Sequence, residues 1–158
     1  MLSWGGPTSI TGDTLPDNIP VVRPAVAGDQ ERVQQLVIRL GHSVAVDSDA
    51  FKKSFAQVLE DSPRTMLHVA ESGGAVAGYA LTTVNTLLYT NGPSAQLQEI
   101  VVDDSVQALG VGTALVRAVE AACGALGVIQ LTVASRRAGG FYDRLGYTQQ
   151  AEYMRRLF

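Results

Sequence analysis

The stretch from Leu97 to Thr113 combines an apolar strand pattern, a short loop and two closely spaced glycines. Gln107, Gly110 and Gly112 stand directly before a segment with helical periodicity. The first backbone N–H groups of a helix have no partner within it and lie at the positive end of its dipole. Glycine lets an anion approach such a backbone closely, so the loop is suited to bind a diphosphate.

Two other phosphate-binding motifs do not fit this loop. A P-loop requires Gly-Lys-Ser/Thr, whereas Gly112 is followed by Thr113 and Ala114. The dinucleotide fingerprint G-x-G-x-x-G requires a third glycine where this chain has Leu115. A Gly-x-Gly alone is also common at helix starts that bind nothing, so the ligand cannot be assigned from the glycines by themselves.

The apolar pattern predicts the elements that position this loop. We expect strands at residues 21–23, 66–70, 75–83, 97–102, 128–134 and 147–157, and helices at 29–40, 48–62, 111–126 and 141–145. The third helix should bury a stripe formed by Val111, Leu115, Val119, Ala122 and Leu126. This order mixes antiparallel hairpins with one strand–helix–strand crossover, which predicts an α/β fold with a mixed sheet.

Composition bounds the function classes. The chain has 158 residues, of which 46% are hydrophobic and 17% charged, as expected for one globular domain with its own core. We place that domain at residues 21–158 and interpret residues 1–20, which are rich in Gly and Pro, as a flexible arm. The formal net charge of −3 disfavours a nucleic-acid partner. No apolar run approaches the length of a membrane span, so we expect no membrane partner.

The single cysteine, Cys123, rules out a disulfide within the chain and fits a reducing cytoplasm. It stands among small helical residues with no histidine beside it, so we expect a packed, inert thiol. His42 and His68 are far apart and have no Cys or carboxylate at ligand spacing. We therefore predict no metal site, and we interpret His68 as a strand residue.

Two motifs together resemble a known family. Gln107-x-x-Gly110-x-Gly112 is similar to the Q/R-x-x-G-x-G/A motif of the GNAT superfamily of N-acetyltransferases, where it also follows a strand. The segment from Ala138 to Tyr147 is similar to the A-x-x-F-Y-x-x-x-G-F/Y segment of that family. The resemblance extends over residues 21–158. It implies a GNAT-type twisted mixed β-sheet flanked by helices on both faces, and acetyl-CoA as a co-substrate.

The resemblance also implies how acetyl-CoA would bind. Its pantetheine arm would pair like an added strand with the backbone of Ile100, Val101 and Val102. Its diphosphate would bind the loop amides, here those of Gln107, Ala108, Leu109, Gly110, Val111, Gly112 and Thr113. The loop departs from many members because it has no arginine. Ser135 stands where many members have an asparagine that contacts the pantetheine arm.

Two catalytic residues follow from the same resemblance. Tyr142 matches the tyrosine that protonates the departing CoA thiolate, with packing on the sheet as its structural alternative. Glu99 matches a glutamate that takes the proton of the amine, with an ion pair to an arginine such as Arg23 as its alternative. Strand alternation places Glu99, Val101 and Asp103 on one face of the sheet. Asp103 and Asp104 are interpreted as loop caps.

The family implies acetyl transfer to a primary amine by direct attack in a ternary complex. We expect the acceptor to be a small molecule and the enzyme to be cytoplasmic. Family members are often dimers, which leaves a homodimer open, but the sequence does not give the oligomeric state. Two alternatives stay open. The acceptor could be a protein lysine or N-terminus, which requires an open groove, or the domain could bind acyl-CoA without catalysis.

Overall fold

The computed structural model describes residues 19–41, 45–107, 109–135 and 140–158. Most of the predicted arm, residues 1–18, and Ala108 of the glycine loop lie outside the described residues. The predictions made for them, and the division of the chain at residue 20, therefore stay predictions.

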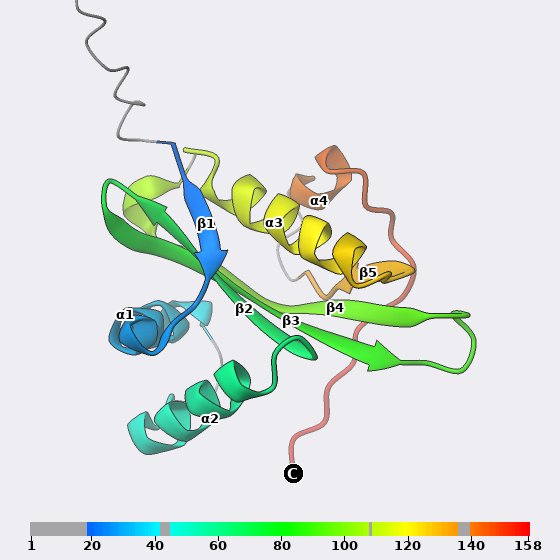
Figure 1. Ribbon diagram of the computed structural model, residues 1–158, viewed down its shortest axis with the longest axis horizontal. Helices are drawn as coiled ribbons and strands as arrows, with labels where there is room; N and C mark the ends of the chain where they lie inside the picture. The colour runs from blue at the N-terminus through cyan, green and yellow to red at the C-terminus, as the bar shows by residue number, and fades with distance from the viewer. Residues whose placement is uncertain (1–18, 42–44, 108, 136–139) are drawn as a thin grey trace, which may run out of the picture.

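The described strands form one mixed sheet, as predicted (Figure 1). Its strands lie in chain order: β1 (Val21–Pro24), β2 (Thr65–Ser72), β3 (Ala75–Thr86), β4 (Pro93–Val102) and β5 (Gln130–Val133). The pairs β1–β2, β2–β3 and β3–β4 are antiparallel, and β5 is parallel to β4. Gly73 and Gly74 make the turn between β2 and β3 with φ angles of 60° and 79°, which favour glycine.

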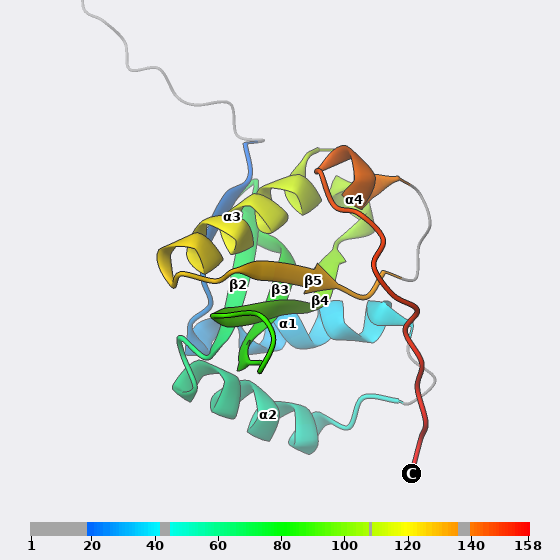
Figure 2. The same cartoon turned by 90° about the vertical axis from the view of Figure 1, so that its right-hand side faces the viewer.

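Helices cover both faces of the sheet (Figures 1 and 2). The four α-helices are α1 (Gln30–Val37), α2 (Ser48–Glu60), α3 (Val111–Ala125) and α4 (Phe141–Arg144). Short 3-10 helices occupy Ala27–Asp29, Ile38–Leu40 and Asp104–Val106. In the views of Figures 1 and 2, α1 and α2 lie on one side of the sheet, and α3 and α4 lie on the other.

The core is divided in two by the sheet. Between α3 and the sheet lie Met66, Ala70, Ala80, Leu97, Val111, Leu115, Val116, Val119 and Cys123. Between the sheet and α1 with α2 lie Val33, Leu36, Phe55, Leu67, Val69, Tyr79 and Val101. Cys123 is buried, as predicted, and burial raises the pKa of its thiol. The two cores hold β3 and β4 rigidly from both sides.

Caps and ion pairs fix the element boundaries. The Asp47 side chain accepts a hydrogen bond from the Ala50 N–H at 2.8 Å and caps α2. Arg23 of β1 donates to Asp29 and to Glu71, with distances of 2.8 Å in both pairs. Arg23 is therefore committed to tying β1 to β2 and to the turn before α1.

Four element predictions are wrong in whole or in part. β4 begins at Pro93 and β5 spans only four residues, because β3 and β4 form a long hairpin that β5 joins over a short stretch. Residues 147–157 form no strand in the described structure, and residues 148–158 are all exposed. Polar and apolar side chains follow one another there without regular alternation, so the segment offers no continuous apolar face to bury against a neighbour. Leu126 lies at the exposed end of α3, and Val116 and Cys123 are buried instead.

Candidate functional site

The edge of β4 is open where the sequence predicts ligand binding. β5 pairs with β4 only from Ser94 to Leu97 and ends at Val133, so residues 98–102 have no neighbour in β5. On its other edge, β4 pairs with β3 through a register shift at Leu81/Thr82, which leaves Gln98 opposite no residue. This is a β-bulge, which locally disrupts the pairing and bends the strand that carries it.

Alternation along β4 decides which backbone groups face the open edge. The Asp103 N–H donates to the Ala77 carbonyl at 2.7 Å, so Asp103 and Ala77 form a bonded pair. Bonded and non-bonded pairs alternate in antiparallel strands, so Val101 bonds to β3 as well. The N–H and C=O groups of Ile100 and Val102 consequently point away from β3, toward the open edge.

The glycine loop lies at the start of α3, directly after β4. Gly110 adopts a left-handed conformation with a φ angle of 79° and precedes the first helical residue. The first helical hydrogen bond runs from the Ala114 N–H to the Gly110 carbonyl at 2.9 Å. The amides of Val111, Gly112 and Thr113 therefore have no partner within the helix, which leaves an anion-binding helix start.

Two other loop amides are already engaged. The Gln107 N–H donates to the Asp104 carbonyl and the Leu109 N–H donates to the Val106 carbonyl. The Gln107 side chain donates to the Asp104 carboxylate at 2.6 Å. Fewer of the predicted amides are therefore available to a diphosphate, and the available ones lie in the first turn of α3.

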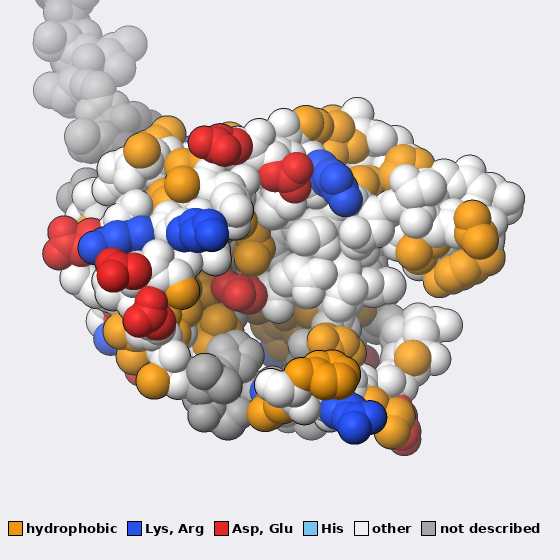
Figure 3. Space-filling model, turned by 90° about the horizontal axis from the view of Figure 1, so that it is seen from below, with side chains coloured by type: hydrophobic (Ala, Val, Ile, Leu, Met, Phe, Trp, Pro, Cys, Tyr) orange, Lys and Arg blue, Asp and Glu red, His pale blue; other side chains and the backbone are white. Residues whose placement is uncertain are grey.

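The open edge and the loop border one cleft of about 1040 Å³. Its lining brings together the predicted residues Glu99, Ile100, Val101, Val102, Gln107, Gly112, Ser135 and Tyr142. It does not include Leu109, Gly110, Val111 or Thr113. The C-terminal segment adds Gln149, Ala151, Glu152, Tyr153 and Arg155, and the end of the first helical region adds Arg39 and Leu40. Figure 3 shows a hollow on the face seen from below, with hydrophobic side chains around it.

Tyr142 reaches this cleft from α4. Its ring makes edge contacts with Phe141 and Tyr147, with centroid separations of 5.0 and 5.6 Å. Burial raises the pKa of the Tyr142 phenol above its ordinary value of 10, so the hydroxyl is neutral near pH 7 and able to donate a proton. A Cβ on Gly112 would lie 3.4 Å from Phe141, so α4 packs closely on the start of α3.

Glu99 reaches the cleft from β4, and its partner is not the one that the sequence suggested. The Tyr79 hydroxyl donates to Glu99 Oε2 at 2.7 Å. Arg23, the suggested ion-pair partner, binds Asp29 and Glu71 instead. Tyr79 belongs to no motif, and the signal that could have found it is the cross-strand register, which pairs Tyr79 with Val101, two residues from Glu99.

Asp103 fixes the turn between β4 and the loop. Its carboxylate accepts from the Ser105 N–H at 3.0 Å, so it caps the Asp104–Val106 turn as predicted. Arg32 and Arg39 also donate to it, which the sequence did not indicate. These hydrogen bonds, led by that of Ser105, hold the pKa of Asp103 well below its ordinary value.

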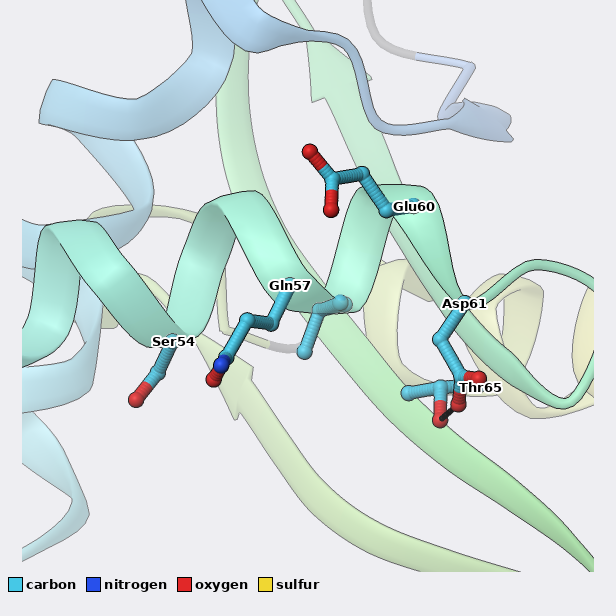
Figure 4. A pocket seen from close by; sticks show the side chains of 6 residues that line it. Ser54, Gln57, Glu60, Asp61 and Thr65 are labelled. Atoms are coloured by element: carbon cyan, nitrogen blue, oxygen red, sulfur yellow. Dashed lines mark hydrogen bonds between the residues drawn. The ribbon is translucent and has the colours of Figure 1, made fainter.

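A second hollow, of about 460 Å³, lies on α2, far along the chain from these residues. Ser54, Gln57, Glu60, Asp61 and Thr65 line it (Figure 4). It contains none of the predicted site residues. Among the described residues, no group of three or more His, Cys, Asp or Glu side chains gathers as metal ligands. In the same part of the chain, no helix has the length and hydropathy needed to cross a membrane.

Solved structures with the same fold include several acetyltransferases. Glucosamine-6-phosphate N-acetyltransferase from Arabidopsis thaliana matches with a TM-score of 0.77 and 18% identity, over 89% of this chain and 99% of that one. A putative acetyltransferase from Agrobacterium tumefaciens matches with a TM-score of 0.75 and 23% identity, over 87% and 99%. A GNAT family acetyltransferase from Staphylococcus aureus matches with a TM-score of 0.73 and 16% identity, over 88% and 98%. At these identities the likeness establishes the fold.

Among curated proteins, none matches this sequence significantly. The family is established by a sequence model instead. The model of the acetyltransferase (GNAT) family matches residues 37–147, which contain β4, the glycine loop, α3 and α4. The matched stretch includes the open strand edge and the two predicted catalytic residues, Glu99 and Tyr142. The chain belongs to the GNAT family of acetyltransferases.

Proposed function

We propose that this protein transfers an acetyl group from acetyl-CoA to the primary amine of a small molecule, in a ternary complex. The observation that carries the proposal is the convergence of four features on one cleft. These are the open edge of β4, the start of α3, the Glu99 carboxylate and the Tyr142 hydroxyl. Acyl-CoA offers amides for the strand edge and a diphosphate for the helix start, so the residues present fit this co-substrate.

Each part of the cleft has a role in the proposed reaction. The backbone groups of Ile100 and Val102 hold the pantetheine amides, and an N–H of this edge stabilises the oxyanion. The free amides at the start of α3 bind the diphosphate, and Ser135 lies on the wall beside the end of β5. Acetyl-CoA supplies the thioester when bound. Glu99 takes a proton from the amine, and Tyr142 gives one to the departing thiolate.

The walls of the cleft favour a small acceptor. The C-terminal segment runs from α4 past β5 and β4 toward the side of α2 (Figure 2). Its residues Gln149, Glu152 and Tyr153 line the same cleft as Glu99. A peptide substrate requires an open groove instead. The Arabidopsis neighbour is named for acetylation of an amino sugar phosphate, an acceptor of the proposed size.

An amine panel tests the proposal. The purified protein is mixed with acetyl-CoA and with amino sugars, aminoalkyl phosphonates, polyamines, amino acids or lysine peptides, and released CoA thiol is measured. We expect transfer to one class of small amine. Transfer to peptides alone would replace the small-molecule acceptor with a protein. Calorimetric binding of acetyl-CoA without transfer to any amine would indicate a binding module.

A further inference from the structure

The hydroxyl of a core tyrosine ends at the candidate site. Tyr79 lies on β3, its side chain is 1% exposed, and it packs among Leu36, Val69 and Val101 in the core beneath α1. A ring held this tightly has few alternative positions. Its hydroxyl therefore occupies a fixed place at the boundary between the core and the cleft.

The Glu99 carboxylate is tied at one oxygen only. Tyr79 donates to Oε2 at 2.7 Å, and in the described part of the chain Oε1 takes no hydrogen bond. Burial, and then the neighbouring carboxylate, raises the pKa of Tyr79 far above its ordinary value of 10. The phenol therefore stays neutral at every working pH and acts only as a donor to Glu99.

We infer that Tyr79 is a positioning residue for acetyl transfer: it holds Glu99 through Oε2 and leaves Oε1 facing the amine. The inference rests on the proposed function, in which Glu99 is the base. A carboxylate beside an apolar core is costly without a partner, and the hydrogen bond from the Tyr79 hydroxyl offsets that cost.

The proton balance of the step leaves Tyr79 unchanged. The amine nitrogen forms a bond to the acetyl carbon, and its proton passes to Glu99 Oε1. The carbon–sulfur bond breaks, and the sulfur takes the proton of the Tyr142 hydroxyl. Tyr79 keeps its own proton throughout, so removing its hydroxyl should alter the placement of Glu99 without abolishing the reaction.

Tyr79→Phe tests the inference because it removes the hydroxyl and keeps the packed ring. We expect kcat to fall roughly ten- to a hundredfold, the scale of one hydrogen bond to a charged group. The KM for acetyl-CoA should stay unchanged.

Two further variants separate positioning from stability. Tyr147→Phe removes the same atom from a comparable pair, since the Tyr147 hydroxyl donates to Glu120 at 3.1 Å on α3. It should leave kcat in place. The double variant Tyr79→Phe/Glu99→Gln should be no slower than Glu99→Gln alone, because Tyr79 acts through Glu99.

The outcomes distinguish this inference from the proposed function. A parent enzyme that transfers acetyl and is slowed by Glu99→Gln, but whose kcat is unchanged by Tyr79→Phe, would overturn the inference alone. A parent that acetylates no amine would remove both. If Tyr79→Phe does not fold, Glu99→Asp is tested instead, because its shorter side chain withdraws the carboxylate from the Tyr79 hydroxyl at a half-buried position. Full turnover in Glu99→Asp would overturn the inference.

Discussion

At the scale of single residues, the proposed acid and the proposed base come to the cleft from different elements. Tyr142 belongs to α4, on the α3 side of the sheet, whereas the side chain of Glu99 is bonded to Tyr79 on the α1 side. A substrate amine and a thioester meeting at the edge of β4 would lie between them. With this separation, one group can take a proton from the amine while the other gives a proton to the thiolate, and the two groups do not exchange the proton directly.

Tyr142→Phe tests the proposed acid. The ring and its contacts with Phe141 and Tyr147 are kept, and only the proton donor is lost. Turnover should fall by roughly ten- to a thousandfold, the usual range for one general acid or base. The dissociation constant of acetyl-CoA, measured by calorimetry, should change little. Unaltered turnover would return Tyr142 to a packing role.

Two of these residues could be predicted from the sequence, and the third could not. Tyr142 and Glu99 stand in or beside linear motifs, so pattern and family resemblance found them. Tyr79 was missed because its role depends on a register between two strands, and a register is set by the whole hairpin and its bulge. The partner suggested for Glu99 was wrong for a related reason: Arg23 instead forms hydrogen bonds with the carboxylates of Asp29 and Glu71.

At the scale of elements, the start of α3 joins three parts of the site. Gly112 faces Phe141 of α4 and Val102 of β4, at 3.4 and 3.7 Å from the position that a Cβ would take. Asp103 ties the end of β4 to Arg32 and Arg39 of the first helical region. The loop is therefore held from both faces of the sheet, which pre-organises its amides for an anion.

Gly112→Val tests the loop. The added methyl groups would press on Phe141 and Val102 and crowd the helix start, so acetyl-CoA affinity should fall at least tenfold. Gly124→Val in the same helix is the control, because a Cβ there meets nothing within 4 Å. Calorimetry on both folded variants gives the comparison. Equal affinities for the two would place the diphosphate elsewhere.

Asp103→Asn tests the anchor of the loop. Replacing the carboxylate weakens its bonds to two arginines and should lower the free energy of unfolding by about 1–2 kcal/mol at pH 7. The pKa of Asp103 is lowered in the fold, so its contribution is present above the ordinary pKa of 3.8 and is lost as the pH falls below it. Denaturant unfolding of parent and variant should therefore converge in acid. Asp104→Asn, at a side chain 79% exposed, should have little effect.

At the scale of the whole molecule, the predicted fold class is confirmed and its C-terminal part is wrong. Strong periodicity placed α1, α2 and α3 and the first strands within a few residues. The last strands failed because residues 148–158 carry mixed polar and apolar side chains with no consistent alternation. The structure uses this segment as a wall of the cleft. Such a role follows from where β5 ends, which local pattern does not determine.

Strand β2 also carries a buried titratable group, His68. His68 of β2 is 9% exposed, and its Nδ1 has no hydrogen-bond partner among the described residues. Burial lowers the pKa of His68 below its ordinary value of 6.5. The folded state therefore keeps the imidazole neutral, whereas the unfolded chain takes up a proton below pH 6.5. Stability that is present above that pH should be lost as the pH falls through it.

His68→Leu should remove this dependence. We expect the variant to lose less stability than the parent between pH 7 and pH 5. The difference in the free energy of unfolding should be at most about 1.4 kcal/mol for each pH unit below 6.5. Denaturant unfolding at several pH values measures it. Thr82→Val is the matched control, because Thr82 Oγ1 is also buried without a partner in the described structure but does not titrate. That variant should shift the free energy of unfolding by a similar amount at every pH. Parallel pH profiles for the parent and His68→Leu would show that the histidine finds a partner, or water, in solution.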